Sequence, residues 1–272
     1  MAVIQAIVVL GLGWVAGSLG ALLGLGGGIL LVPFLVNVLH FTLQEAAGVS
    51  LMTVIATSGA VSSHTAGRQL INMRLGMVLE IATTIGGLAA GLTAQHLSQW
   101  TLTLAFVSVT AVIAFVTVLR LERRNVLEPS VGPGRLGARF HDPDSGRDIV
   151  YRVKRLPVAL AASFVAGNVS GLLGIGGGVL KVPVLNAWCG VPIRAAAATS
   201  ALMIGVTAAA TAPIYYAHGV VAPHVAAAAV VGVLGGSTLG MRLGLTLPVR
   251  RLKGLMAVVL SLVSLSMAWR LL

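Results

Sequence analysis

Long apolar segments separated by short polar connections run through the whole chain. Most of these segments approach or reach the roughly 20 residues that an α-helix needs to cross a bilayer. Together they predict an all-α polytopic membrane protein with about 8–10 membrane segments. The predicted segments are 3–23, a short piece at 29–39, 46–62, 75–95, 101–119, 157–173, a second short piece at 179–188, 195–216, 221–241 and 254–271.

Two glycine-rich breaks, 150 residues apart, interrupt this pattern. The first is Gly20-Ala-Leu-Leu-Gly-Leu-Gly-Gly-Gly-Ile-Leu-Leu-Val-Pro33, and the second is Ser170-Gly-Leu-Leu-Gly-Ile-Gly-Gly-Gly-Val-Leu-Lys-Val-Pro183. Scattered Ala and Leu can match by chance in so apolar a chain, whereas Gly-x-Gly-Gly-Gly with Val-Pro at the same spacing is far more specific. We therefore interpret the chain as two copies of one unit.

A polar region separates the two copies. Residues 120–155 contain nine Lys or Arg and all three Asp of the chain. Within it, 142–146 is typical of a turn and predicts a small hairpin, and a solvated linker is favoured over a regulatory element. The predicted organisation is a first transmembrane repeat at 1–120, a hydrophilic loop at 121–155 and a second transmembrane repeat at 156–272.

The orientation depends on whether the short pieces, with their connections at 29–43 and 179–193, cross the membrane. If they are re-entrant, each unit crosses four times, and Arg194 and the basic residues at 242–253 face away from the central loop. If they cross, each unit crosses five times, and these residues lie on the same side as the loop. Positive residues gather in cytoplasmic loops, which favours five crossings, inverted-topology repeats and a cytoplasmic loop at 121–155. Fifteen helical residues span only about 22 Å, so the glycines must contribute to the crossing or lie deep in the protein.

Composition supports this picture and excludes other classes. The chain is 57% hydrophobic and 9% charged, whereas soluble domains carry about 25% charged residues. The net charge of +11 fits cytoplasmic loops rather than a nucleic-acid partner. Cys189 is the single cysteine, which excludes an internal disulfide and leaves no cysteine cluster for a metal. We expect no metal and no cofactor.

The glycine breaks are the leading candidates for a binding site. Backbone groups inside a bilayer must be paired, so a broken helix survives only inside protein or beside a polar cavity. The half-helix that follows presents N–H groups and a positive dipole end, which attract anions. Close helix packing is the alternative explanation, but a matched pair in opposite orientations favours a site near the midplane. The candidate glycines are Gly24, Gly26, Gly27, Gly28, Gly174, Gly176, Gly177 and Gly178.

Both Gly-Gly-Gly-x-Leu-x-Val-Pro motifs, the hydroxyl-rich segment after each and the central hydrophilic loop resemble the TauE/SafE sulfite exporter family, also called the 4-toluene sulfonate uptake permease family. The resemblance covers nearly the whole chain. It implies a multi-pass protein of the inner (plasma) membrane that transports sulfite, sulfonates or related sulfur-containing anions. It fixes neither the substrate nor the direction. Exact symmetry fails at Lys181, where the first copy has Leu31.

Hydroxyl side chains follow each break at matched positions. Three in the first copy have i, i+3, i+7 spacing and share one helix face, where they could donate hydrogen bonds to an oxyanion. Packing between helices is slightly favoured for any single hydroxyl, and less so for two matched stripes. The candidates are Ser50, Thr53 and Thr57 in the first copy and Thr199, Ser200 and Thr207 in the second.

A few ionisable residues fall within or beside the apolar segments. Lys181 is either a cation for the substrate or a lysine that snorkels to the interface, and the sequence supports both equally. Glu45, His64 and Glu80 could relay protons that couple to transport. A structural role is preferred for both glutamates because each lies near a helix start, where an acid stabilises the dipole.

Three functions remain to be compared. A secondary transporter would work by alternating access of one repeat against the other around the paired breaks. An anion channel could use the same half-helix ends. An intramembrane enzyme has less support, because every Asp lies in the central loop and Ser62, Ser63 and His64 have no evident oxyanion arrangement. We expect a non-enzymatic carrier whose partners are a small anion and the lipid bilayer, and whose Ala and Gly faces would allow a homodimer.

Overall fold

The computed structural model describes residues 2–65, 70–119, 132, 134–142, 146–247 and 249–269, in which helices dominate. Six helices, α1, α3, α4, α6, α8 and α9, are long and apolar enough to cross a membrane. This confirms the prediction of an all-α polytopic membrane protein. The elements are α1 Ala2–Leu23, α2 Gly28–Asn37, α3 Leu43–Thr65, α4 Met73–Ala94, α5 Gln99–Leu119, β1 Ala138–Asp142, β2 Arg147–Tyr151, α6 Leu156–Leu173, α7 Gly178–Ala187, α8 Ile193–Ala217, α9 Pro223–Thr246 and α10 Val249–Ala268.

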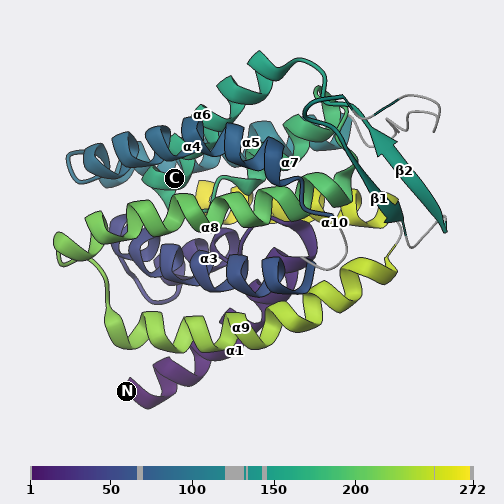
Figure 1. Cartoon of the computed structure of the whole chain (residues 1–272). Helices are drawn as coiled ribbons and strands as arrows, with labels where there is room; N and C mark the ends of the chain where they lie inside the picture. Colours follow the sequence, from purple (N-terminus) through teal and green to yellow (C-terminus); the bar gives the residue numbers. More distant parts are fainter. Residues whose placement is uncertain are drawn as a thin grey trace.

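The predicted hairpin forms and marks one end of the helix bundle (Figure 1). Strands β1 and β2 pair antiparallel, with Phe140 opposite Ile149. The side-chain amide of Asn72 donates to the Tyr151 hydroxyl at 3.1 Å, and the Asn72 side chain also accepts from the N–H of Leu75 in the first turn of α4. This contact fixes the hairpin to the start of α4. We call this side of the bundle the hairpin end and the opposite side the far end. The turn residues 143–145 lie outside the described residues.

The two repeats are interleaved. Helix α1 packs along α9, and α6 packs along α4, so the first helix of each repeat lies against the fourth helix of the other. Glycines allow this close approach: a Cβ at Gly236 would collide with the backbone of Trp14, and one at Gly86 with the backbone of Phe164. These two contacts are related by the same 150-residue offset as the breaks. Part of the glycine content therefore serves close helix packing.

Helices α3 and α8, which occupy equivalent places in the two repeats, run antiparallel. Gly48, near the start of α3, lies beside Tyr215, near the end of α8. Further along α3, the Ser58 hydroxyl donates to the carbonyl of Leu202, nearer the start of α8. Two equivalent helices that pack antiparallel are related by a pseudo-twofold axis perpendicular to the helix axes. The repeats therefore have the predicted inverted topology.

The short helices α2 and α7 are half-helices that begin inside the bundle. Helix α2 starts at Gly28, beside the Ser50 side chain in α3, and ends at Asn37, from where the chain enters α3 at the far end. Ten residues rise only about 15 Å, and the buried glycine segment before Gly28 supplies the rest of the path. Residues 29–43 thus return the chain to the end where α1 begins, as the five-crossing alternative requires.

The positive charges of the described residues gather at one end. Apart from the buried Lys181, every described Lys and Arg lies at the hairpin end, and the connections at 38–42, 95–98 and 218–222 contain none. Arg68, Arg270 and residues 120–131 lie outside the described residues. The predicted division of the chain into two repeats and a central loop, at 120/121 and 155/156, stays a prediction. The residues at the hairpin end are Arg74, Arg135, Arg139, Arg147, Arg152, Lys154, Arg155, Arg194, Arg242, Arg250, Arg251 and Lys253.

Candidate functional site

The two glycine breaks meet in the middle of the bundle, and we call their contact the junction. A Cβ atom at Gly28 would lie 2.7 Å from the carbonyl oxygen of Gly174, and one at Gly178 would lie 2.5 Å from that of Gly24. Gly24 and Gly174 have φ angles of 68° and 67°, in the left-handed region that glycine adopts without strain. Backbone conformation and close approach therefore both require glycine at the junction.

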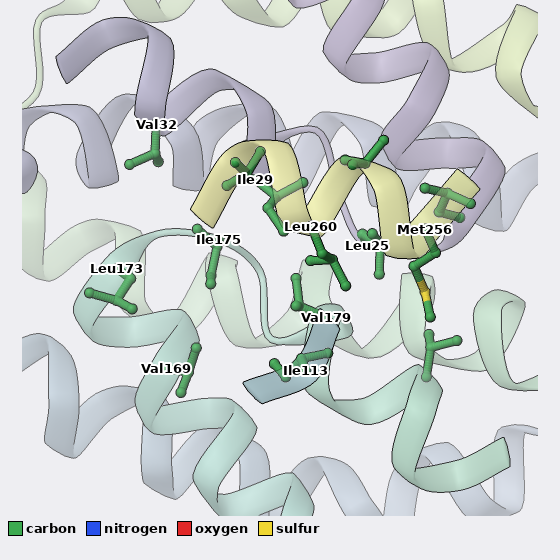
Figure 2. Packing of buried hydrophobic residues seen from close by; sticks show 14 of the residues in the cluster. Leu25, Ile29, Val32, Ile113, Val169, Leu173, Ile175, Val179, Met256 and Leu260 are labelled. Carbon is green, nitrogen blue, oxygen red and sulfur yellow. The ribbon is translucent and has the colours of Figure 1, made fainter. Parts of the chain in front are cut away.

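Both half-helices start at the junction and run away from it in opposite directions. Gly27 and Gly177 occupy the N-cap positions of α2 and α7 and have no side chain to bond the first-turn N–H groups. Figure 2 shows Leu25 and Ile175 in one buried cluster, together with Leu260 of α10. The positive dipole ends of two helices thus face one region of the interior. The structure brings the predicted glycines together, and their role in binding an anion stays a prediction.

A buried ion pair lies beside the junction. The ammonium of Lys181, in the first turn of α7, lies 3.6 Å from Oε2 of Glu80 in α4, and the two side chains are 1% and 12% exposed. The other carboxylate oxygen of Glu80 accepts hydrogen bonds from the hydroxyls of Thr207, at 2.6 Å, and Thr84, at 3.1 Å. Among the described residues, the Lys181 ammonium has no hydrogen-bond partner. The cation is therefore charge-compensated but keeps donors that an anion could use.

The predicted hydroxyls separate into groups. Ser50 donates to the Gly174 carbonyl at 2.5 Å, which ties α3 to the second break. Thr53 and Thr57 donate to carbonyls of their own helix. All three hydroxyls thus have acceptors within the protein, and their role in binding a substrate stays a prediction.

In the second copy, the Thr199 hydroxyl accepts from the N–H of Asn72, whereas the buried Ser200 hydroxyl has no partner among the described residues. Thr207 contacts Glu80. Of the predicted hydroxyls, Ser200 is thus the one without a partner among the described residues, and the role of these hydroxyls in binding a substrate stays a prediction.

The three coupling candidates lie in different places. Glu45 accepts from both the N–H and the hydroxyl of Thr42, each at 2.8 Å, and so caps α3 at the far end. This is the structural role expected from its position near a helix start. His64 lies in the last turn of α3 at the hairpin end. Glu80 is the candidate that contacts Lys181.

The pairing of Glu80 with Lys181 was not predicted from the sequence. A signal was present, because charges inside apolar segments are costly and pair with one another. The contact of Tyr215 was not predicted either: its buried hydroxyl donates to the Gly171 carbonyl at 2.6 Å. No composition signal distinguishes such a tyrosine from an interfacial one.

Comparison with known proteins agrees with this architecture. The chain is 28% identical over 259 residues to the probable membrane transporter protein YunE of Bacillus subtilis (strain 168), an alignment that covers 93% of each chain. No solved structure is significantly similar to it. The family model described as sulfite exporter TauE/SafE matches residues 9–267. With both glycine breaks and the helices around them inside that match, the chain belongs to the TauE/SafE family of membrane transporters.

Proposed function

We propose that this protein is a secondary transporter that moves small sulfur-containing anions, such as sulfite, sulfonates or related organosulfur anions, across the inner membrane. Family membership supports membrane transport, and the family description supports sulfite as the first substrate to test. The substrate would be held at the junction, between the two half-helix N-termini. An anionic substrate suits this site, because the two half-helix N-termini and Lys181 supply positive potential to a buried region.

Lys181 is the observation that carries this proposal. A lysine buried to this degree is expensive inside a membrane and usually serves a ligand or a charged partner. Glu80 compensates its charge across 3.6 Å, and no other described residue accepts a hydrogen bond from the ammonium. An arriving anion would therefore compete with Glu80 for the ammonium, while Thr207 and Thr84 continue to hold the carboxylate. Coupling of transport to a proton at Glu80 is the simplest arrangement that keeps the site neutral.

We place the hairpin end, with the loop at 121–155, in the cytoplasm. The described basic residues outside the bundle interior lie at that end, as the positive-inside rule predicts for cytoplasmic connections. Alternating access would then move the interleaved pairs α1/α9 and α6/α4 relative to the α3/α8 contact. All glycines of both breaks are buried in this conformation, so the substrate site is closed to at least one side.

Counterflow in proteoliposomes tests the proposal. Vesicles loaded with unlabelled sulfite should transiently accumulate external radiolabelled sulfite, because a carrier exchanges substrate and a pore does not. Lys181→Ala should abolish this accumulation. Arg251→Ala, which removes an exposed cation at the hairpin end, is the matched control and should preserve it. Flux that does not saturate and shows no counterflow would favour a channel, and absence of flux with sulfite and with organosulfonates would contradict transport of this substrate class.

A further inference from the structure

A cavity at the hairpin end has a cationic lining. It measures about 320 Å³ and lies between the ends of α1, α3 and α9 and the beginnings of α8 and α10. His64, Arg194 and Arg242 line it, and its described lining includes no Asp or Glu. Most of the remaining wall is apolar, including Leu23 and Met241. The volume is about twice that of an engineered cavity that binds benzene, so the cavity suits an organic anion with an apolar body.

The cavity lies between the protein surface and the junction. His64 and Arg242 are exposed, whereas Arg194 is only 8% exposed and lies deeper. The Arg194 guanidinium donates to the Leu247 carbonyl at 3.0 Å, which fixes its position beside the end of α9. Ala197 lines the same cavity and packs against Gly24 of the first break, where a Cβ atom would lie 2.7 Å from its Cα. Ala197 therefore lies between the cavity and the junction.

The described residues of the far end include no Lys or Arg. The 150-residue offset that relates the two repeats also relates each of the three basic residues of the cavity to a non-basic residue at the far end. The cationic character of the cavity is thus a specific feature of one end and does not follow from the repeated fold. The related pairs are His64 with Ile214, Arg194 with Gln44, and Arg242 with Leu92.

At the far end, an aromatic ring occupies the equivalent space. Thr65 lines the cavity, and its counterpart in the second repeat is Tyr215. The Tyr215 side chain is fully buried, lies 3.6 Å from where a Cβ of Gly48 would be, and bonds the carbonyl of Gly171. Tyr215 therefore fills, at the far end, the space whose equivalent at the hairpin end is an open cavity.

We infer that this cavity is an anion-binding vestibule, in which Arg194 and Arg242 hold an organic oxyanion from the aqueous phase before it reaches the junction. The role as a vestibule rests on the proposed transport function, whereas the binding site itself does not. Two arginines suit a sulfonate or carboxylate head, since guanidinium groups bond oxyanions with paired donors. Apolar walls suit the body of the ligand, and the N-terminus of α8 adds positive potential beside Arg194.

Ligand-dependent thermal stability of the purified full chain in dodecyl maltoside tests the inference, with benzenesulfonate as the probe. A ligand that binds the folded state raises the melting temperature, and the stabilisation grows with the logarithm of one plus the ratio of ligand concentration to Kd. Arg194→Gln and Arg242→Leu each install the residue found at the equivalent far-end position. Both should weaken the apparent Kd at least tenfold. Arg74→Gln, an exposed cation at the same end that does not line the cavity, should leave the Kd within twofold of wild type.

The outcomes separate this inference from the transport proposal. Equal Kd values in all four proteins would overturn the vestibule, whatever the transport result. Arginine-dependent binding of short-chain phosphatidylglycerol without binding of benzenesulfonate would also overturn it, because the cavity would then hold a lipid headgroup. Arginine-dependent benzenesulfonate binding in a protein that shows no counterflow would support the site and count against transport. Arg242 is exposed, so its variant keeps the test valid if Arg194→Gln fails to fold.

Discussion

The structural role of the ion pair can be separated from its functional role by substitution. Lys181 and Glu80 are each replaced by the residue at the equivalent position of the other repeat. These residues are Leu31 and Val230, so the variants are Lys181→Leu, Glu80→Val and the double variant. At an effective dielectric constant of about 20, two unit charges 3.6 Å apart attract by about 5 kcal/mol. Removing lysine alone leaves a buried carboxylate, which can escape by protonation. Protonating an ordinary glutamate at pH 7 costs about 3.7 kcal/mol, so we expect Lys181→Leu to lose about 3–4 kcal/mol of unfolding free energy.

The double variant should recover most of this loss, because no unpaired charge remains and apolar side chains replace both charged groups. Reversible SDS unfolding of the four proteins gives the coupling free energy from the double-mutant cycle. We expect about 3 kcal/mol and no counterflow in either variant that lacks Lys181. A double variant as unstable as Lys181→Leu, or a coupling energy near zero, would refute the ion pair. A stable double variant with normal counterflow would instead refute substrate binding by Lys181.

Three further predictions follow from other contacts. Gly178→Ala should abolish folded protein in detergent size-exclusion chromatography, because its methyl group would lie 2.5 Å from a carbonyl oxygen, whereas Gly59→Ala, which meets no atom within 4 Å, should fold normally. Tyr215→Phe loses a buried hydrogen bond worth about 1 kcal/mol, so backbone amides at the far end of α6 and α8 should exchange hydrogen about fivefold faster, and an unchanged rate would argue against a filled far end. Burial raises the pKa of the Cys189 thiol to about 11, even though Arg155 lowers it. Folded protein should therefore resist maleimide at pH 7.4 and react once SDS unfolds it, and rapid labelling of the folded protein would contradict the packing around this residue.

Features set by the backbone could be predicted from the sequence. The glycine breaks, the 150-residue offset and the hairpin around 142–146 all follow from local requirements for unusual φ angles, turns or close approach. The number of crossings followed from charge distribution, because positive residues cluster on one side of a membrane. The offset also relates the starts of equivalent helices, since α2 begins at Gly28 and α7 begins 150 residues later, at Gly178. These inferences needed no knowledge of which helix packs on which.

Features set by packing partners could not be predicted in this way. Glu80 illustrates the reason. Its place near the start of the predicted segment 75–95 suggested an acid that stabilises the helix dipole, an effect confined to the first turn. Helix α4 begins at Met73, which puts Glu80 two turns into the helix and beside α7. Its partner Lys181 lies in the other repeat, and only the interleaving of the repeats, which no local pattern encodes, brings the two together.

Residues that differ between equivalent positions of the two repeats bias the equilibrium between the two conformations of a carrier. If both halves were identical, a carrier built from inverted repeats would be equally stable open to either side, because exchanging the conformations of the two halves gives an equivalent state. Tyr215, opposite Thr65 in the repeat alignment, adds a hydrogen bond that exists only when the far end is filled. One such bond, at about 1 kcal/mol, shifts a two-state population about fivefold. The glycines shared by both halves therefore define the two states, whereas the residues that differ between the halves decide which state is populated.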